Sequence, residues 1–125
     1  MAKARILYAD DDLELTRLVA DCLLDEGYDL IIANDGEEGL EKLITEQPDL
    51  VILDVMMPQL NGWEIVRYMR EKDEYKDIPV LMLTGIGPAL NEMTAPLYGA
   101  NDHLDKPFEI DDLVSKVASL LEGRG

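Results

Sequence analysis

The sequence predicts an α/β domain built on a parallel sheet, and one pattern carries most of this prediction. Short apolar runs alternate five times with segments whose apolar residues recur at helical spacing. Such alternation implies a parallel sheet with helices on both faces and right-handed crossovers. Five units fit a flavodoxin-like, doubly wound fold with a five-stranded sheet in the order 2-1-3-4-5 and five helices. At 125 residues, the chain is expected to be one domain, residues 1–125.

The five apolar runs are the predicted strands. They cover residues 6–9, 30–33, 50–53, 80–83 and the short segment 103–105. The third run reads Leu-Val-Ile-Leu, and continuous branched aliphatic residues indicate a strand that is buried on both faces. Asp54 follows this run directly, so it is expected where the edge of the sheet opens to solvent.

Four segments have a clear helical period, at residues 13–26, 35–46, 63–71 and 110–121. Gly27 and Pro48 stand where the first two helices are expected to end. The apolar stripes of these two helices are expected to contain Leu15, Leu18, Val19, Cys22 and Leu23 in the first, and Leu40, Leu43 and Ile44 in the second.

The segment between Thr84 and Gly99 has a weaker helical pattern. It contains two further glycines and two prolines, and Pro96 would kink or end a helix. A short or irregular fourth helix is expected there.

Composition limits the partners of this domain. The formal net charge is −16 and the isoelectric point is about 4.1, so the domain should repel nucleic acid and anionic membranes, and no direct contact with either is expected. Cys22 is the only cysteine, which excludes an intramolecular disulfide and fits the cytoplasm; it is expected to be an inert core thiol. The sequence begins without the pattern of a signal peptide. No run approaches the roughly 20 apolar residues of a membrane span.

Reactive polar residues follow four of the predicted strands. Asp10 and Asp11 follow the first, Asp54 the third, Thr84 the fourth and Lys106 the last. Strands 1 and 3 are neighbours in the expected order, so the three acids should meet at one edge of the sheet. Carboxylates suit Mg²⁺, and Mn²⁺ is a second candidate. A carboxylate can also accept a phosphoryl group as an acyl phosphate, while a cation, a lysine and a hydroxyl offset the charge on the transferred group.

Taken singly, these residues have plainer interpretations. The run Asp10, Asp11 and Asp12 resembles a helix N-cap, supported by Glu14 three residues after Asp11. Both roles are compatible if Asp12 faces the helix and the other two acids face the crevice. Asp54 could equally be a hydrogen-bonded acid at the end of a strand.

Likewise, Thr84 alone is an ordinary strand-end threonine and Lys106 alone a surface lysine. Their occurrence together with the acids, at four different strand ends, is what favours a phosphoryl site.

The chain resembles the receiver domain of two-component response regulators, over roughly residues 5–121. Each matching motif is weak by itself, but the full set in this order is highly specific. The matching residues are Asp10-Asp11, Asp54, Met57-Pro58, Gly62, Thr84, Gly99-Ala100 and Lys106-Pro107-Phe108.

The resemblance implies that Asp54 takes a phosphoryl group from the phosphohistidine of a sensor histidine kinase or a histidine phosphotransfer domain. It implies Mg²⁺ bound by Asp11, Asp54 and the main-chain carbonyl of Met56, with Asp10 acting through a water. Thr84 and Lys106 would contact the phosphoryl oxygens.

The same resemblance implies a cis peptide bond between Lys106 and Pro107. It further implies a signalling protein and not an enzyme with a separate substrate, since the domain would catalyse only its own phosphorylation and dephosphorylation. Its output partner would be a downstream protein or a fused effector domain, and a homodimer formed on phosphorylation is compatible with it.

Two positions depart from the family pattern. Gly85 stands where the family often has alanine, which loosens a loop that must move. His103 stands where a tyrosine or phenylalanine usually turns inward as Thr84 is drawn to the phosphate. Histidine changes charge near neutral pH, so a switch built on His103 would be pH-sensitive, although an ordinary exposed histidine is the plain alternative. The output surface is expected on the fourth helix, the strand at 103–105 and the last helix.

Three other functions compete with this one. A haloacid dehalogenase-type phosphotransferase would want a second acid two residues after Asp54, where Met56 stands. A flavin or nucleotide binder would want a phosphate-binding loop rich in glycine, serine and threonine after the first strand, where three aspartates stand. A pseudo-receiver, a pure interaction module that works without phosphorylation, is the remaining alternative.

Overall fold

Five parallel strands form one sheet in the order β2-β1-β3-β4-β5, as the sequence predicts. The computed structural model describes residues 4–57, 60–84 and 100–123. The strands are β1 (Arg5–Ala9), β2 (Asp29–Ala33), β3 (Leu50–Asp54), β4 (Val80–Thr84) and β5 (Asp102–Asp105).

Four of the five expected helices lie within the described residues. They are α1 (Leu13–Asp25), α2 (Gly36–Glu46), α3 (Gly62–Glu71) and α5 (Ile110–Gly123). Their ends agree with the predicted ends to within two residues. The expected fourth helix falls between Thr84 and Gly99, outside the described residues, and the numbering therefore passes from α3 to α5.

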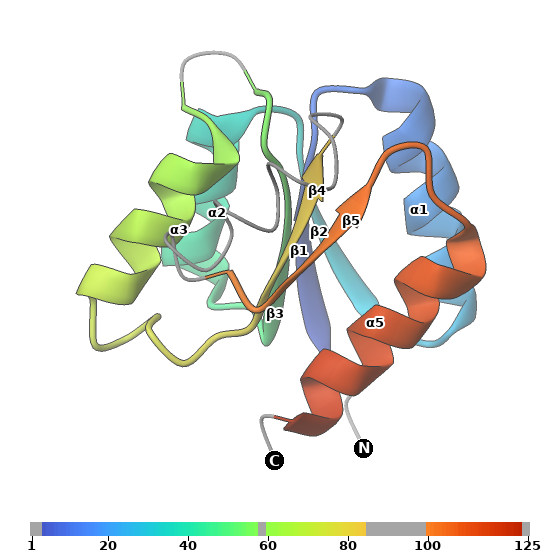
Figure 1. Ribbon diagram of the computed structural model, residues 1–125. Helices are drawn as coiled ribbons and strands as arrows, with labels where there is room; N and C mark the ends of the chain where they lie inside the picture. Colours follow the sequence, from blue (N-terminus) through green and yellow to red (C-terminus); the bar gives the residue numbers. More distant parts are fainter. Residues whose placement is uncertain (1–3, 58–59, 85–99, 124–125) are drawn as a thin grey trace.

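The helices cover the two faces of the sheet in pairs, with α1 and α5 on one face and α2 and α3 on the other (Figure 1). Each face has its own apolar cluster, because successive strand residues point to opposite faces. Leu7 and Ala9 of β1 pack on the side of α2 and α3, whereas Ile6 and Tyr8 pack on the side of α1 and α5. Every residue of β3 is buried, as its aliphatic sequence predicts.

Local signals set the starts and ends of the helices. Asp12 is the N-cap of α1, and its side chain accepts a hydrogen bond from Leu15 N–H, so the capping role belongs to this third aspartate. The support expected from Glu14 is wrong, because the capping residue is Asp12 and not Asp11. Gly27 has φ 96° just after α1, a conformation that favours glycine.

The sequence did not reveal why α3 begins where it does. Asn61 is its N-cap, and the Asn61 and Glu64 side chains each accept the other residue's backbone N–H in a capping box. The helix therefore starts at Gly62, one residue before the predicted start.

The predicted apolar stripes are too wide. Leu18 and Ile44 are 53% and 44% exposed, and Cys22 is only half-buried, so the expectation of a core thiol is wrong. In an α-helix consecutive residues are about 100° apart. Leu18 therefore points to the side when its neighbour Val19 points into the core, where it is fully buried. Among the described residues, no helix is long and apolar enough to cross a membrane.

Candidate functional site

The topology brings three aspartates together at the carboxyl ends of β1 and β3. Ala9 and Leu53 are partners in the parallel pairing of these strands, and the residues that follow them are Asp10 and Asp54. Carboxylate oxygens of Asp10, Asp11 and Asp54 all lie within 4.8 Å of one another. Asp10 and Asp54 are buried, whereas Asp11 is exposed. The cluster thus has a buried floor and one acid at the solvent side.

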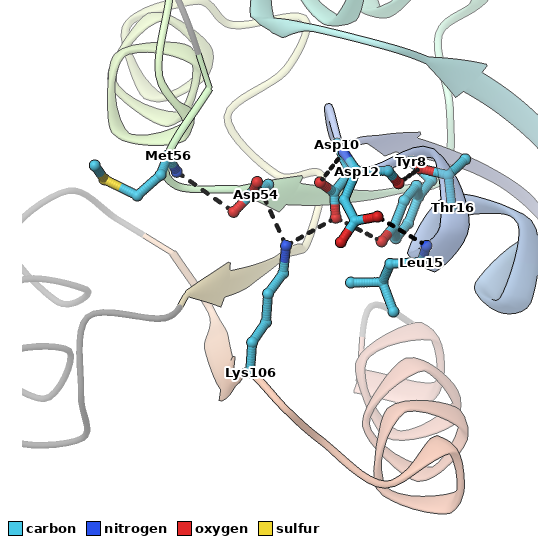
Figure 2. Close-up of polar contacts among 8 residues, drawn as sticks. All are labelled: Tyr8, Asp10, Asp12, Leu15, Thr16, Asp54, Met56 and Lys106. Atoms are coloured by element: carbon cyan, nitrogen blue, oxygen red, sulfur yellow. Dashed lines mark hydrogen bonds and ion pairs between the residues drawn. The ribbon is translucent and has the colours of Figure 1, made fainter.

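Lys106 joins this cluster from the far end of the chain. Its Nζ lies 3.0 Å from Asp10 Oδ2 and 3.4 Å from Asp54 Oδ2 (Figure 2). Burial alone would lower the pKa of this amine, but the hydrogen bond to Asp10 and the charges of Asp10 and Asp54 outweigh burial and raise it. Lys106 is therefore a fixed positive charge between two buried carboxylates.

Asp54 is a carboxylate whose ionisation is finely balanced. Burial raises its pKa, the charge of Asp10 raises it further, and the charge of Lys106 lowers it, which leaves the pKa at about 7. Met56 N–H approaches Asp54 Oδ1 at 3.4 Å, and this contact also favours the ionised form. Besides Met56, the side chains of Asp10 and Lys106 are the hydrogen-bond partners of Asp54, so its two oxygens still have lone pairs for a ligand.

A close helix–strand approach holds Asp54 in place. Gly62 at the start of α3 donates its N–H to Val55 O, directly after β3. A side-chain Cβ at Gly62 would stand 2.7 Å from the Asp54 carbonyl oxygen and 3.2 Å from Val55 Cα. Position 62 therefore needs glycine for the helix to start this near the strand that carries Asp54.

The other predicted site residues are placed less completely. Thr84 ends β4, and its backbone pairs with Asp105, one residue before Lys106. Met56 follows β3 with a 65% exposed side chain, and the role predicted for its carbonyl stays a prediction. His103 is a half-buried residue of β5, and its role as a switch also stays a prediction. The peptide bond between Lys106 and Pro107 is cis, which confirms that prediction.

Sequence reasoning missed one member of the site, Tyr8. The side chain of Tyr8 is fully buried, and its hydroxyl donates a hydrogen bond of 2.8 Å to Asp10 Oδ2 (Figure 2). Burial, reinforced by the negative charge of Asp10, raises the pKa of this hydroxyl, so it remains protonated and can donate. The signal available in the sequence was its spacing, since residues two apart on a strand share a face.

An apolar groove of about 420 Å³ opens beside the acids. Its lining consists of Asp12, Leu15, Leu18, Lys106, Pro107 and Phe108. The groove thus lies between α1 and the segment that joins β5 to α5, and the amine that reaches the acids forms part of its wall. Leu18, which the rotation of α1 keeps out of the core, lines this groove.

The donor set fits a hard divalent cation. The three side-chain candidates are carboxylates, whose oxygens Mg²⁺ and Mn²⁺ prefer, and their mutual distances allow one ion to meet all three. Three carboxylates facing one lysine also leave an excess of negative charge that a cation would offset.

The model of the response regulator receiver domain family matches residues 6–118. This match covers most of the 125 residues, including all three aspartates and Lys106. The chain therefore belongs to the response regulator receiver domain family.

Relatives and solved structures agree with this assignment. The chain is 39% identical to the transcriptional regulatory protein TrcR of Mycobacterium tuberculosis over 117 residues, which cover 94% of this chain and 45% of TrcR. It is 40% identical to the transcriptional regulatory protein CpxR of Escherichia coli over 117 residues, 94% of this chain and 49% of CpxR. The chain thus spans about half the length of these relatives.

A similar solved structure is the receiver domain of the Francisella response regulator 1452. It superposes with a TM-score of 0.91 at 29% identity, covering 98% of this chain and all of that one. The likeness therefore extends over the whole sheet and its flanking helices.

Proposed function

We propose that this receiver domain is an active phosphoacceptor, in which Asp54 takes a phosphoryl group from a phosphohistidine. The observation that carries this proposal is the position of Asp54. It is a buried strand-end carboxylate with a lysine amine 3.4 Å away and two further acids that complete a cation site. A pseudo-receiver would not need all of these groups together.

The chemistry at Asp54 is an in-line displacement. A carboxylate oxygen of Asp54 forms a bond to phosphorus as the bond from phosphorus to the donor imidazole nitrogen breaks, and the electron pair of that bond stays on the nitrogen. The product is an aspartyl phosphate. Lys106, 3.4 Å from Asp54, would neutralise charge on the transferred group, and Thr84 at the end of β4 would donate to a second oxygen.

Asp10, Asp11 and Asp54 would hold Mg²⁺, which would offset the negative charge that gathers on the transferred group. The main-chain carbonyl of Met56 is a further ligand candidate. The chain's own contribution is to fix the two buried acids and Lys106 in advance, so that little reorganisation is needed during transfer.

The phosphodonor partner would be a sensor histidine kinase or a histidine phosphotransfer domain. Its histidine must reach Asp54, so its surface must cover the rim of the site. The groove between α1 and the β5–α5 segment suits a helix of that partner, because it is apolar, adjoins the site and includes Lys106 in its wall. We place this exchange in the cytoplasm, where kinases make phosphohistidine from ATP.

The output partner would be an effector. TrcR and CpxR are transcriptional regulators about twice as long as this chain. We therefore expect a DNA-binding effector domain joined to the receiver domain. The output could also pass to a separate protein or through a homodimer that forms on phosphorylation. On this proposal the domain is no enzyme with a separate substrate. It acts only on its own phosphorylation state.

The test is labelling by a small phosphodonor. Acetyl phosphate with Mg²⁺ should add one phosphoryl group to the chain, detected by intact mass. Asp54→Asn should remove this labelling, while Asp49→Asn, which changes another acid beside β3, should keep it. Labelling of the Asp54→Asn variant at the normal rate, or none in the wild-type chain, would contradict the proposal.

A further inference from the structure

Tyr8 lies directly beneath the acid cluster without a part in the transfer described above. It belongs to β1, two residues before Asp10 and on the same face of the strand. Its ring is packed in the apolar cluster between the sheet and the helices α1 and α5, and none of its surface is exposed. Its hydroxyl points to Asp10 (Figure 2).

The Tyr8 hydroxyl occupies one of the two carboxylate oxygens of Asp10. Oδ2 accepts from the Tyr8 hydroxyl at 2.8 Å and from Lys106 Nζ at 3.0 Å. Oδ1 accepts from Asp12 N–H at 3.0 Å. Each carboxylate oxygen has about two lone-pair positions, so these donors fill Oδ2 and leave one position on Oδ1. The hydroxyl thereby determines which oxygen of Asp10 remains for a cation or for a water on it. Asp10 and the protonated form of Asp54 also share a side-chain hydrogen bond, which is given up when a cation ionises Asp54.

Of the two hydrogen bonds to Oδ2, the one from Tyr8 should persist when Asp54 is phosphorylated, whereas the one from Lys106 should weaken. Lys106 is shared with Asp54, and once Asp54 carries a phosphoryl group the new negative oxygens compete for the amine. The Tyr8 ring is fixed in the core and its hydroxyl has Asp10 as its acceptor. Asp10 has no solvent exposure, so after Lys106 turns away the Tyr8 hydroxyl and Asp12 N–H are the donors among the described residues that still stabilise its charge.

We propose that Tyr8 is a positioning residue of the cation and phosphoryl site. Its hydroxyl holds Asp10 with Oδ1 free for the cation, and it continues to hold Asp10 when Lys106 turns to the phosphoryl group. This inference rests on the proposed phosphoacceptor function for its second half. The first half, cation binding, can be measured without any phosphorylation.

The test compares Tyr8→Phe with the wild-type chain. Phenylalanine keeps the ring and removes the hydroxyl. Mg²⁺ affinity, measured by isothermal titration calorimetry, should fall about tenfold, as is usual when the partner of a ligand carboxylate is removed. Labelling by acetyl phosphate should slow strongly at low Mg²⁺ and much less at saturating Mg²⁺. Tyr75→Phe is the matched control, because Tyr75 is also nearly buried but packs in the cluster on the other face.

A second comparison separates positioning from core packing. In an Asp10→Asn background the change Tyr8→Phe should alter Mg²⁺ affinity by less than twofold, because the partner of the hydroxyl has already been changed. An equal loss of affinity in both backgrounds would mean that Tyr8 acts through the core, and it would overturn the proposal.

If Tyr8→Phe does not fold, as judged by urea unfolding, 3-fluorotyrosine at position 8 replaces it. Its ¹⁹F resonance should shift when Mg²⁺ binds, whereas the same label at Tyr75 should not. A resonance at position 8 that ignores saturating Mg²⁺ overturns the proposal. Wild-type Mg²⁺ affinity in Tyr8→Phe also overturns it, whether or not the wild-type chain is labelled on Asp54. A wild-type chain that binds Mg²⁺ but is never labelled contradicts the phosphoacceptor function instead.

Discussion

At the scale of single residues, burial and charge act on Asp54 in opposite directions. Burial and Asp10 raise its pKa, Lys106 lowers it, and the result is about 7, well above that of a carboxyl group in the unfolded chain. The metal-free folded protein therefore keeps a proton on Asp54 at pH values where the unfolded chain has lost it. A bound cation would favour the ionised form, which is the form that attacks phosphorus.

We therefore predict a specific pH dependence for the metal-free protein. Because the folded-state pKa is raised, the stabilisation from this proton is present below about pH 4 and is lost as the pH rises through about 7. Asp54→Asn removes this dependence. The variant should gain on the order of 1–3 kcal/mol of unfolding free energy relative to the wild-type chain between pH 5 and pH 8, since one pKa unit corresponds to about 1.4 kcal/mol.

The measurement is urea unfolding in EDTA at several pH values. Asp21→Asn is the control, because Asp21 is an exposed acid of α1 outside the site. A constant difference between Asp54→Asn and the wild-type chain across this range would show that Asp54 has an ordinary carboxyl pKa.

At the scale of elements, α1 has two functions on different sides. It packs on the sheet through Thr16, Val19 and Leu23, and its capping residue Asp12 follows the two acids of the site. Leu18 and Leu24 are both 53% exposed, but only Leu18 lines the groove beside Lys106. The docking surface proposed above would cover Leu18 and leave Leu24 exposed.

The pair Leu18 and Leu24 provides a matched test of the docking surface. Leu18→Asp should slow phosphotransfer from a histidine kinase that phosphorylates the wild-type chain by at least tenfold, because a charge would be buried against the partner. Leu24→Asp should change it less than twofold. Labelling by acetyl phosphate, which needs no docking, should be normal in both variants. Equal transfer rates in the two variants would show that the groove is not the docking surface.

At the scale of the whole molecule, the protein carries a large net negative charge and, in addition, a compact cluster of three carboxylates. The net charge of −16 is spread over the surface, while three carboxylates meet within 4.8 Å at one edge of the sheet. Any salt screens the diffuse charge, but only a cation that binds the folded cluster gives stabilisation that saturates. The two contributions can therefore be separated by experiment.

We predict that Mg²⁺ raises the melting temperature at constant ionic strength. An ion that binds only the folded state adds about 1.4 kcal/mol when its concentration is ten times Kd. Asp11→Asn should remove most of this gain without disturbing the core, because Asp11 is exposed, whereas Asp21→Asn should retain it. A melting temperature that does not respond to millimolar Mg²⁺ in the wild-type chain would count against the cation site.

Local sequence patterns determined the strands, their order in the sheet and most of the helices. The periods of the apolar residues are properties of short segments, and they predicted five strands, their order and four helices to within two residues. The strand order in turn predicted that Asp10 and Asp54 would meet, because parallel strands present their carboxyl ends at one edge. The same rule brings Lys106 to this edge from β5, whereas its contact with Asp10, 96 residues away, was not predicted.

The tertiary structure decided what depends on packing. It turned the Leu18 side chain toward the groove instead of the core, and it left Cys22 half-buried. These outcomes depend on how α1 lies on the sheet, and a helical period fixes the rotation of a helix only approximately.

The same holds for the electrostatics of the site. The pKa of Asp54 and the hydrogen bond from Tyr8 to Asp10 result from distances of a few ångströms among buried groups. The sequence alone determined which residues would gather at the edge of the sheet. Only the packed structure decided which atoms touch, because burial removes the water that would otherwise satisfy each group separately.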